Sequence, residues 1–346
     1  MRKIFTLLFV LMASISLMAT EGALSGKFTI NADGDQIVFS QGNLQYKATT
    51  NTWRFAENQW DTIGGANWNI AADYDGWIDL FGWGTSGYDN TANDPFAVNY
   101  QPWSNSTAEL NLTLTVNDTE YQSNNVNMYG YGPSSFMEDG NLSGSSANYD
   151  WGVYNAISNG GNQAGLWRTL NMDEWKYILR SRSSADDLRS QATVCGVHGY
   201  VLLPDNFNLP DGLSWSAQTK NWDTNTYDSQ AWSAMAAAGA VFLPAAGCRT
   251  TSIKGVGSSG GYWSASWGTK QYALSWGFWD DHGGNQMYIT NRYMGYSIRL
   301  VQTAPADPEA IENTSISTQA VKHIVNGQLL IEKNGVRYNA LGQEAK

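Results

Sequence analysis

The stretch Tyr272-Ala-Leu-Ser-Trp-Gly-Phe-Trp279 decides the fold class of this chain. Every second residue from Tyr272 to Phe278 is large and apolar, which is typical of a β-strand that turns one face to a core and leaves Trp279 on the other. Further strands are expected at residues 262–266, 287–289 and 296–301, between turns rich in Gly, Asp and Asn. This part of the chain is therefore predicted to be antiparallel sheet.

The residues before this sheet predict an opening hairpin followed by long loops. Residues 27–30 and 36–40 flank Asn31-Ala-Asp-Gly-Asp35, whose residue types favour a turn between two strands. Residues 53–103 are rich in Trp and Gly and are expected to be loop. Residues 104–150 are rich in Asn and Ser, and we expect an insertion or a long surface loop there.

Two segments predict short helices. Asn171 is placed to cap the first, Glu174 completes a capping box, and Trp175 and Leu179 belong to its apolar stripe. The second covers residues 229–238 and ends at a glycine. Each helix leads to a strand that ends in Leu-Pro, Gly199-Tyr-Val-Leu-Leu-Pro204 and Gly239-Ala-Val-Phe-Leu-Pro244. The expected fold class is therefore α+β, rich in strands and loops, with two or so short helices.

The composition excludes several classes of protein. Of 346 residues, 42% are hydrophobic and only 15% are charged, and 16 Trp and 35 Gly are present. Wholesale disorder needs few aromatic residues and high charge, so it is excluded. The formal net charge is −11, or 18 − 31 = −13 without residues 1–19, which include Arg2 and Lys3. A surface this acidic repels phosphate backbones, so nucleic acid is not an expected partner.

Residues 1–19 have the layout of a secretory signal peptide. Arg2 and Lys3 precede an apolar run over residues 4–18, and Ala19 is followed by polar residues. The alternative is a buried N-terminal helix. No Cys follows the run, which argues against a lipid anchor, and no later stretch approaches the ~18 apolar residues of a membrane span. We expect an exported protein, at the cell surface or extracellular, with the periplasm as a further possibility.

The two cysteines leave their pairing open. Cys195 lies in a Val-Cys-Gly sequence that predicts a tight hairpin turn, and Cys248 follows a glycine that ends a strand. Export permits a disulfide, but nothing in the spacing brings the two thiols together.

The composition changes after Val301. Residues 303–320 begin with a Pro- and acid-containing stretch and are predicted to be a linker. Residues 321–346 contain Asn326-Gly327 and Asn334-Gly335, and Asn-Gly is the strongest short hairpin signal. We expect a small three-stranded β-meander that either completes the main sheet or serves as an address for secretion machinery.

Several ordered motifs carry a family resemblance. They are Trp167-Arg-Thr-Leu-Asn-Met-Asp-Glu-Trp175, Gly199-Tyr-Val-Leu-Leu-Pro-Asp205, Gly239-Ala-Val-Phe-Leu-Pro-Ala-Ala-Gly247, Gly261-Tyr-Trp-Ser-Ala-Ser266 and Gly295-Tyr-Ser-Ile-Arg-Leu-Val301. Together, over residues 25–302, they resemble the Fibrobacter succinogenes major paralogous domain family of exported bacterial proteins. The resemblance implies a C-type-lectin-like domain related to the formylglycine-generating, sulfatase-modifying fold. Residues 323–343 resemble C-terminal segments of exported Bacteroidetes proteins.

The residues argue against catalysis, and no cofactor or metal is expected. The resemblance raises the copper-binding cysteine pair of formylglycine-generating enzymes, but residues 261–301 contain no Cys. His198, His282 and His323 lie in separate segments without zinc-ligand spacing. Asp280-Asp281-His282 suggests a hydrolytic cluster or a cation site, although adjacent acids in a Gly-rich turn mostly face solvent.

Aromatic surface is the remaining functional signal. Flat aromatic faces next to Asn, Asp and Gln side chains suit the binding of sugars and peptides. The candidate ligand-binding residues are Trp267, Trp279, Asp280, Asp281, His282, Asn285, Tyr288 and Tyr293. The alternative is that these aromatics only pack on glycine-rich loops. We expect a non-enzymatic, adhesin-like binding protein for a glycan or another surface polymer. An envelope or host surface protein as partner, and an enzyme of unrecognised mechanism, are the alternatives.

Overall fold

The computed structural model describes residues 21–89, 101–102, 113–116, 119–122, 140–250, 252–269, 272–280, 286–306, 321–325, 328–333 and 336–339. The chain divides into two compact units. One is Ala19–Ala304, called the main domain below, and the other contains the last three strands. The predicted domain boundary at residue 302 is thus close to the division at Ala304.

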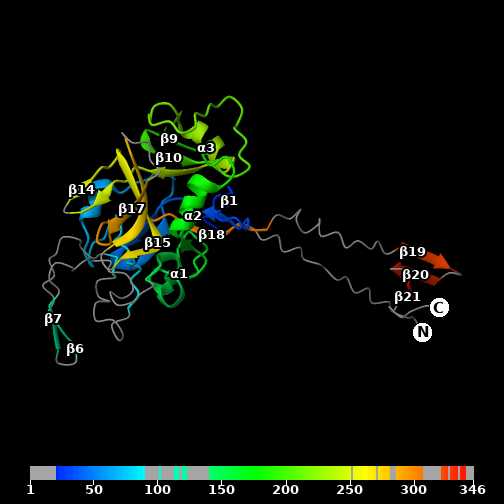
Figure 1. Cartoon of the computed structure of the whole chain (residues 1–346), viewed down its shortest axis with the longest axis horizontal. Coiled ribbons are helices and arrows are strands. Elements are labelled where there is room, and N and C mark those ends of the chain that lie inside the picture. Colours follow the sequence, from blue (N-terminus) through cyan, green and yellow to red (C-terminus); the bar gives the residue numbers. More distant parts are fainter. Residues whose placement is uncertain are drawn as a thin grey trace, which may run out of the picture. The chain divides into compact units, whose positions relative to one another are not determined.

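The main domain is a mixed α+β structure with many short strands and few short helices (Figure 1). Its described strands are β1 (Phe28–Thr29), β2 (Gln36–Phe39), β3 (Leu44–Lys47), β4 (Thr52–Phe55), β5 (Trp77–Ile78), β6 (Thr113–Val116), β7 (Thr119–Gln122), β8 (Arg168–Thr169), β9 (Arg189–Val194), β10 (Val197–Leu202), β11 (Thr226–Tyr227), β12 (Val241–Pro244), β13 (Cys248–Arg249), β14 (Ile253–Lys254), β15 (Ser259–Thr269), β16 (Tyr272–Trp279), β17 (Gln286–Asn291) and β18 (Leu300–Thr303). Its described helices are α1 (Trp151–Tyr154), α2 (Met172–Lys176), α3 (Ser229–Ala237), the 3₁₀ turns η1 (Ala48–Thr50), η2 (Gly64–Trp68) and η4 (Gly144–Tyr149), and the π-helical turn η5 (Tyr177–Ser181).

The first and last strands of the main domain lie in one sheet. Its order is β1-β2-β18-β8, and Val301 of β18 pairs with Phe39 of β2. The predicted opening hairpin is confirmed, since β1 and β2 pair antiparallel with Phe28 opposite Ile37. The two ends of the main domain are therefore held together by backbone hydrogen bonds.

The sheet β15-β16-β17 has apolar side chains packed against both faces. On β16, Trp276 and Phe278 belong to one buried cluster and Ala273 to another. The expected alternation of a core face and an exposed face is therefore wrong at the middle of β16, where Ser275 on the second face is also fully buried. The small residues on that face leave room for a second packed layer.

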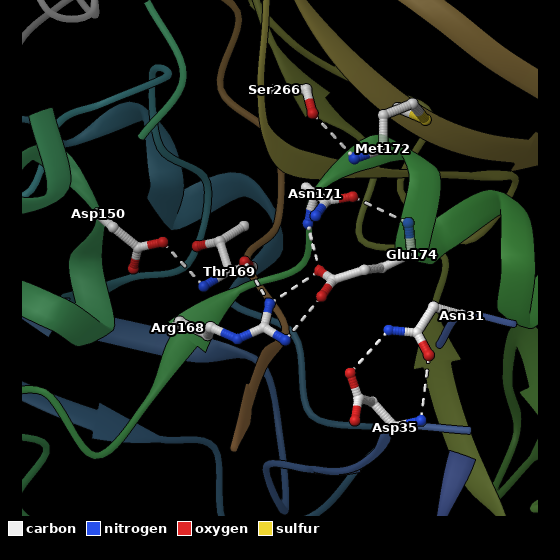
Figure 2. A network of polar contacts seen from close by, with 9 residues as sticks. All are labelled: Asn31, Asp35, Asp150, Arg168, Thr169, Asn171, Met172, Glu174 and Ser266. Atoms are coloured by element: carbon white, nitrogen blue, oxygen red, sulfur yellow. Dashed lines mark hydrogen bonds and ion pairs between the residues drawn. The ribbon is translucent and has the colours of Figure 1, made fainter. Parts of the chain in front are cut away.

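The predicted capping box starts α2 and ties it to neighbouring strands. The side chain of Asn171 accepts a hydrogen bond from the Glu174 N–H at 2.9 Å, and the Asn171 N–H donates to Glu174 Oε2 at 2.8 Å. Figure 2 shows Arg168 of β8 facing Glu174, with both guanidinium bonds at 2.8 and 2.7 Å. The Met172 N–H donates to Ser266 Oγ of β15 at 2.9 Å. The helix is thus fixed at its N-terminus by polar contacts and buries Trp175 beneath it.

The two Leu-Pro segments are neighbouring strands. β10 and β12 pair antiparallel, with Tyr200 opposite Leu243. β9 and β10 form the predicted hairpin, whose turn residue Cys195 has a φ of 50°. The second predicted helix is also confirmed as α3, and Gly239 follows it with a φ of 95°.

Several described elements differ from the sequence-based expectations. β4 pairs with β3, so the region from residue 53 onwards is not all loop. β6 and β7 pair antiparallel within a segment expected to lack regular structure, and α1 follows the buried cap Asp150. Thr113-Leu-Thr-Val116 does alternate, but the alternation is only four residues long, too short to stand out from the surrounding polar sequence.

The last three strands confirm the predicted meander. β19 (Val321–Val325), β20 (Gln328–Lys333) and β21 (Val336–Asn339) pair antiparallel in chain order.

Candidate functional site

A pocket of about 150 Å³ lies at one end of the β15-β16-β17 sheet. Half of its lining is made of small residues and half of larger side chains. The small residues are Gly247, Gly260, Gly261, Gly277 and Ser259, and the larger ones are Cys248, Phe278, Trp279, Tyr288 and Tyr296.

Two glycines allow aromatic rings to lie against the strands. Gly261 of β15 and Gly277 of β16 are directly opposite each other in the antiparallel ladder, so they share one face of the sheet. A Cβ atom on Gly261 would be 2.8 Å from the Tyr296 ring, and one on Gly277 would be 3.4 Å from the Tyr288 ring. Only glycine at position 261 permits this approach, and Gly277 leaves the floor of the pocket open.

Aromatic rings form the walls. The rings of Trp279 and Tyr288 are tilted by 37° with centroids 5.2 Å apart, and Tyr288 Oη donates to Gln286 Oε1 at 3.1 Å. Tyr296 hydrogen-bonds to the side chain of Thr290. Burial raises the pKa of both tyrosines to about 12, so their hydroxyls stay protonated at neutral pH. The walls combine apolar faces with neutral hydroxyl groups.

The segment around Cys248 forms one rim of the pocket. The Gly247 N–H donates to the Ser259 carbonyl at 2.8 Å, which sets this rim against β15. Cys248 is a free, half-buried thiol, and burial raises its pKa. A protonated thiol is a weak nucleophile. Cys195, the other cysteine, is also free, so the two do not form a disulfide.

A buried polar cluster anchors this rim from below. Arg249 is fully buried, and its guanidinium donates to the Leu80 carbonyl at 2.6 Å. Its backbone N–H also donates to the Gly295 carbonyl at 2.9 Å, next to Tyr296. The rim and the segment that carries Tyr296 are therefore held to each other and to the same core.

Asp79 lies in this cluster, and the pKa of its carboxyl group is shifted. Its carboxylate accepts hydrogen bonds from the Ile63 N–H at 2.9 Å and the Asn67 side chain at 2.6 Å. Burial nevertheless raises the pKa of Asp79 to about 6, because desolvation outweighs these bonds and the nearby charge of Arg249.

The structure brings together some of the sequence-predicted site residues. Trp279 and Tyr288 line the pocket, and the exposed Asp280 follows Trp279. Asp281, His282 and Asn285 lie outside the described residues.

Trp267 and Tyr293 lie at the other end of the sheet. Trp267 pairs with Ala273, whereas Trp279 pairs with Ser259, so the two tryptophans are separated by six positions along β16, about 20 Å. Tyr293 is in the turn after β17, whose last residue pairs with Tyr272.

Trp267 is a packing residue and not a turn residue as expected. β15 continues to Thr269, beyond the predicted end at residue 266, and irregular pairing on both sides of Trp267 interrupts the alternation. Its ring packs against a buried cluster and closely faces Gly140.

The sequence did not identify Tyr296, Cys248, Gly261 or Gly277 as site residues. Tyr296 reaches the site through single-residue pairings, Phe81 with Tyr296 and Tyr262 with Ser297, which leave no periodic pattern. The available signal was a glycine at the same level of two adjacent strands, Gly261 and Gly277.

The described residues contain no group of three or more His, Cys, Asp or Glu side chains that could hold a metal ion. In the same part of the chain, no helix combines the length and apolar character needed to cross a bilayer. No family model, curated protein or solved structure matches this chain.

Proposed function

We propose that the protein is an exported, non-enzymatic binding protein, at the cell surface or secreted, that recognises a glycan or another surface polymer. The binding site is the pocket between Tyr288, Trp279 and Tyr296. The observation that carries this proposal is a glycine-floored pocket with aromatic walls and neutral hydroxyl groups. Aromatic faces pack on the C–H faces of sugar rings, and hydroxyls satisfy the sugar's polar groups.

The chemistry of the lining supports binding over catalysis. A nucleophilic mechanism needs a general base within hydrogen-bonding reach of the nucleophile. Among the described residues that line the pocket, Cys248 is the one thiol, burial raises its pKa, and none is a His, Asp or Glu.

The proposal includes the fold family. A C-type-lectin-like, sulfatase-modifying-like domain of the Fibrobacter succinogenes major paralogous family is consistent with the mixed α+β architecture and its few short helices. Export through residues 1–19 and a role of the meander in secretion or attachment are part of the same proposal.

A protein partner is the second candidate. Ile289 is 66% exposed on β17, which is an edge strand of its sheet. An apolar side chain on an edge strand favours strand addition by another polypeptide. Ile289 pairs with Leu274 and Tyr288 with Ser275, so the two side chains point to opposite faces of the sheet, and this surface is separate from the pocket.

A glycan array followed by tryptophan-fluorescence titration tests the proposal. Trp279→Ala is the test variant and Trp68→Ala, at a residue 44% exposed outside the pocket, is the matched control. We expect at least one glycan to bind, with binding lost in Trp279→Ala and kept in Trp68→Ala. An array without binding, together with specific capture of one envelope protein that Ile289→Lys abolishes, would establish the second candidate instead.

A further inference from the structure

We infer that the pocket binds one uncharged sugar ring, seated above Gly277 between Tyr288 and Tyr296, and that it discriminates against acidic sugars. This inference rests on the proposed glycan-binding function. Beyond that function, it specifies the charge and the size of the sugar unit that the pocket recognises.

The described lining residues offer no charge to an acidic ligand. None of the ten described lining residues carries a group that is charged at neutral pH, because burial raises the pKa of Tyr288 and Tyr296 to about 12 and also raises that of Cys248. A carboxylate or sulfate that entered would lose its hydration without gaining a counter-charge from the ten lining residues. Lys254, which lies opposite Cys248 on β14, is exposed to solvent, so its attraction to a bound anion is screened. The exposed Asp280 beside the pocket and the net charge of −11 add repulsion.

The size of the pocket sets the unit that fits. Its volume of about 150 Å³ is below the ~300 Å³ at which pockets for drug-sized ligands begin. At ~30 Å³ for each water molecule, it replaces roughly five waters. That space takes one ring of a polymer, while the neighbouring units stay outside.

The polar groups favour a sugar over an apolar side chain from a protein. Four lining residues carry a hydroxyl or thiol group: Ser259, Tyr288, Tyr296 and Cys248. A leucine or phenylalanine side chain would form no hydrogen bond with these groups, whereas the hydroxyls of a sugar can. A sugar ring can place its apolar face on the aromatic walls and direct its hydroxyls to the polar groups of the lining.

Gly277 is the position that controls entry. Its φ is not in the left-handed region, so alanine is compatible with the backbone. The added methyl carbon would lie 3.1 Å from the Gly260 carbonyl oxygen and 3.4 Å from the Tyr288 ring, on the floor of the pocket. Gly65→Ala is the matched control, because a Cβ there meets nothing within 4 Å.

The test compares neutral sugars with their acidic counterparts. Methyl glucoside, galactoside and mannoside are titrated by saturation-transfer NMR beside the corresponding methyl uronosides. We expect at least one neutral glycoside to bind at least tenfold more tightly than its uronoside. The Gly277→Ala variant should lose at least tenfold in affinity, and Gly65→Ala should lose none. Tyr288→Ala should lose at least tenfold as well, and it decides the outcome if Gly277→Ala does not fold.

Three results would overturn the inference in different ways. A uronoside that binds as tightly as its neutral partner refutes the charge selectivity and leaves the glycan-binding function standing. Neutral binding that is unchanged in both Gly277→Ala and Tyr288→Ala places the sugar outside this pocket. If no methyl glycoside and no arrayed glycan binds, the proposed function itself is wrong.

Discussion

Gly261 and Gly277 lie directly opposite each other on β15 and β16, and each has a tyrosine ring over it, Tyr296 and Tyr288 respectively. Strand-interior glycines weaken a sheet because they add entropy to the unfolded chain and pack no side chain. A facing pair of them therefore has a structural use here, which is to let rings approach the backbone on the face that bears the pocket.

Gly261→Ala should destabilise the main domain. Its Cβ would be 2.8 Å from the Tyr296 ring, and overpacking of this kind costs about 1–3 kcal/mol. Urea unfolding measures the loss, with Gly65→Ala as the control that should change stability by less than about 0.5 kcal/mol. Because Tyr296→Ala removes the clash, the double variant should be more stable than the sum of the two single losses predicts. Additive losses would mean that the ring and the glycine are not coupled.

Asp79 should make the main domain less stable as the pH rises from about 4 to about 6. Burial raises the pKa of this carboxyl from 3.8 to about 6, so between these values the folded state holds a proton that the unfolded state has released. A difference of about two pKa units corresponds to about 3 kcal/mol, present below pH 4 and lost above pH 6.

The comparison of Asp79→Asn with the wild type isolates this effect. The free energy of unfolding of Asp79→Asn, relative to wild type, should rise across the same pH range, whereas the exposed Asp33→Asn should track wild type throughout. A constant difference between Asp79→Asn and wild type from pH 4 to pH 7 would contradict the raised pKa.

Asn171→Ala should cost about 1 kcal/mol of stability, because the Glu174 N–H loses its acceptor at the start of α2. Asn171→Ser supplies another capping oxygen and should restore most of this loss. Thermal unfolding of the two variants makes the comparison. Equal destabilisation by serine and alanine would show that the cap itself contributes little.

Both cysteines should react as free thiols. Cys195 and Cys248 do not pair, so alkylation of the unfolded protein without a reductant should add two labels by mass spectrometry. If the protein takes up labels only after reduction, Cys195 and Cys248 form a disulfide.

Deletion of residues 306–346 should leave the main domain folded, with its melting temperature changed by only a few degrees. The three strands β19–β21 pair with each other, and the main domain completes its terminal sheet with β18. We also expect the deletion to change where the protein accumulates. Failure of the truncated protein to fold would mean that the tail belongs to the core, and unchanged location and amount would refute its role as an address.

The sequence predicts those elements that depend on neighbours close in the chain. The capping box at Asn171, the Cys195 turn and the meander each need contacts over a few residues, so their residue types reveal them. Only some residues of the candidate site can be predicted from the sequence. Trp279 and Tyr288 stand out as aromatics near a turn, but Tyr296 joins them through isolated pairings with distant segments. Trp267 misleads because β15 continues to Thr269, past its predicted end at residue 266, and so places this ring inside a strand and against a buried cluster.

The most direct measurement is a crystal structure of residues 20–346 with the neutral glycan that gives the largest fluorescence change. We expect one sugar ring above Gly277, in contact with the rings of Tyr288 and Tyr296 and within hydrogen-bonding reach of Ser259. A glycan bound elsewhere on the surface, with the pocket empty of sugar, would contradict it.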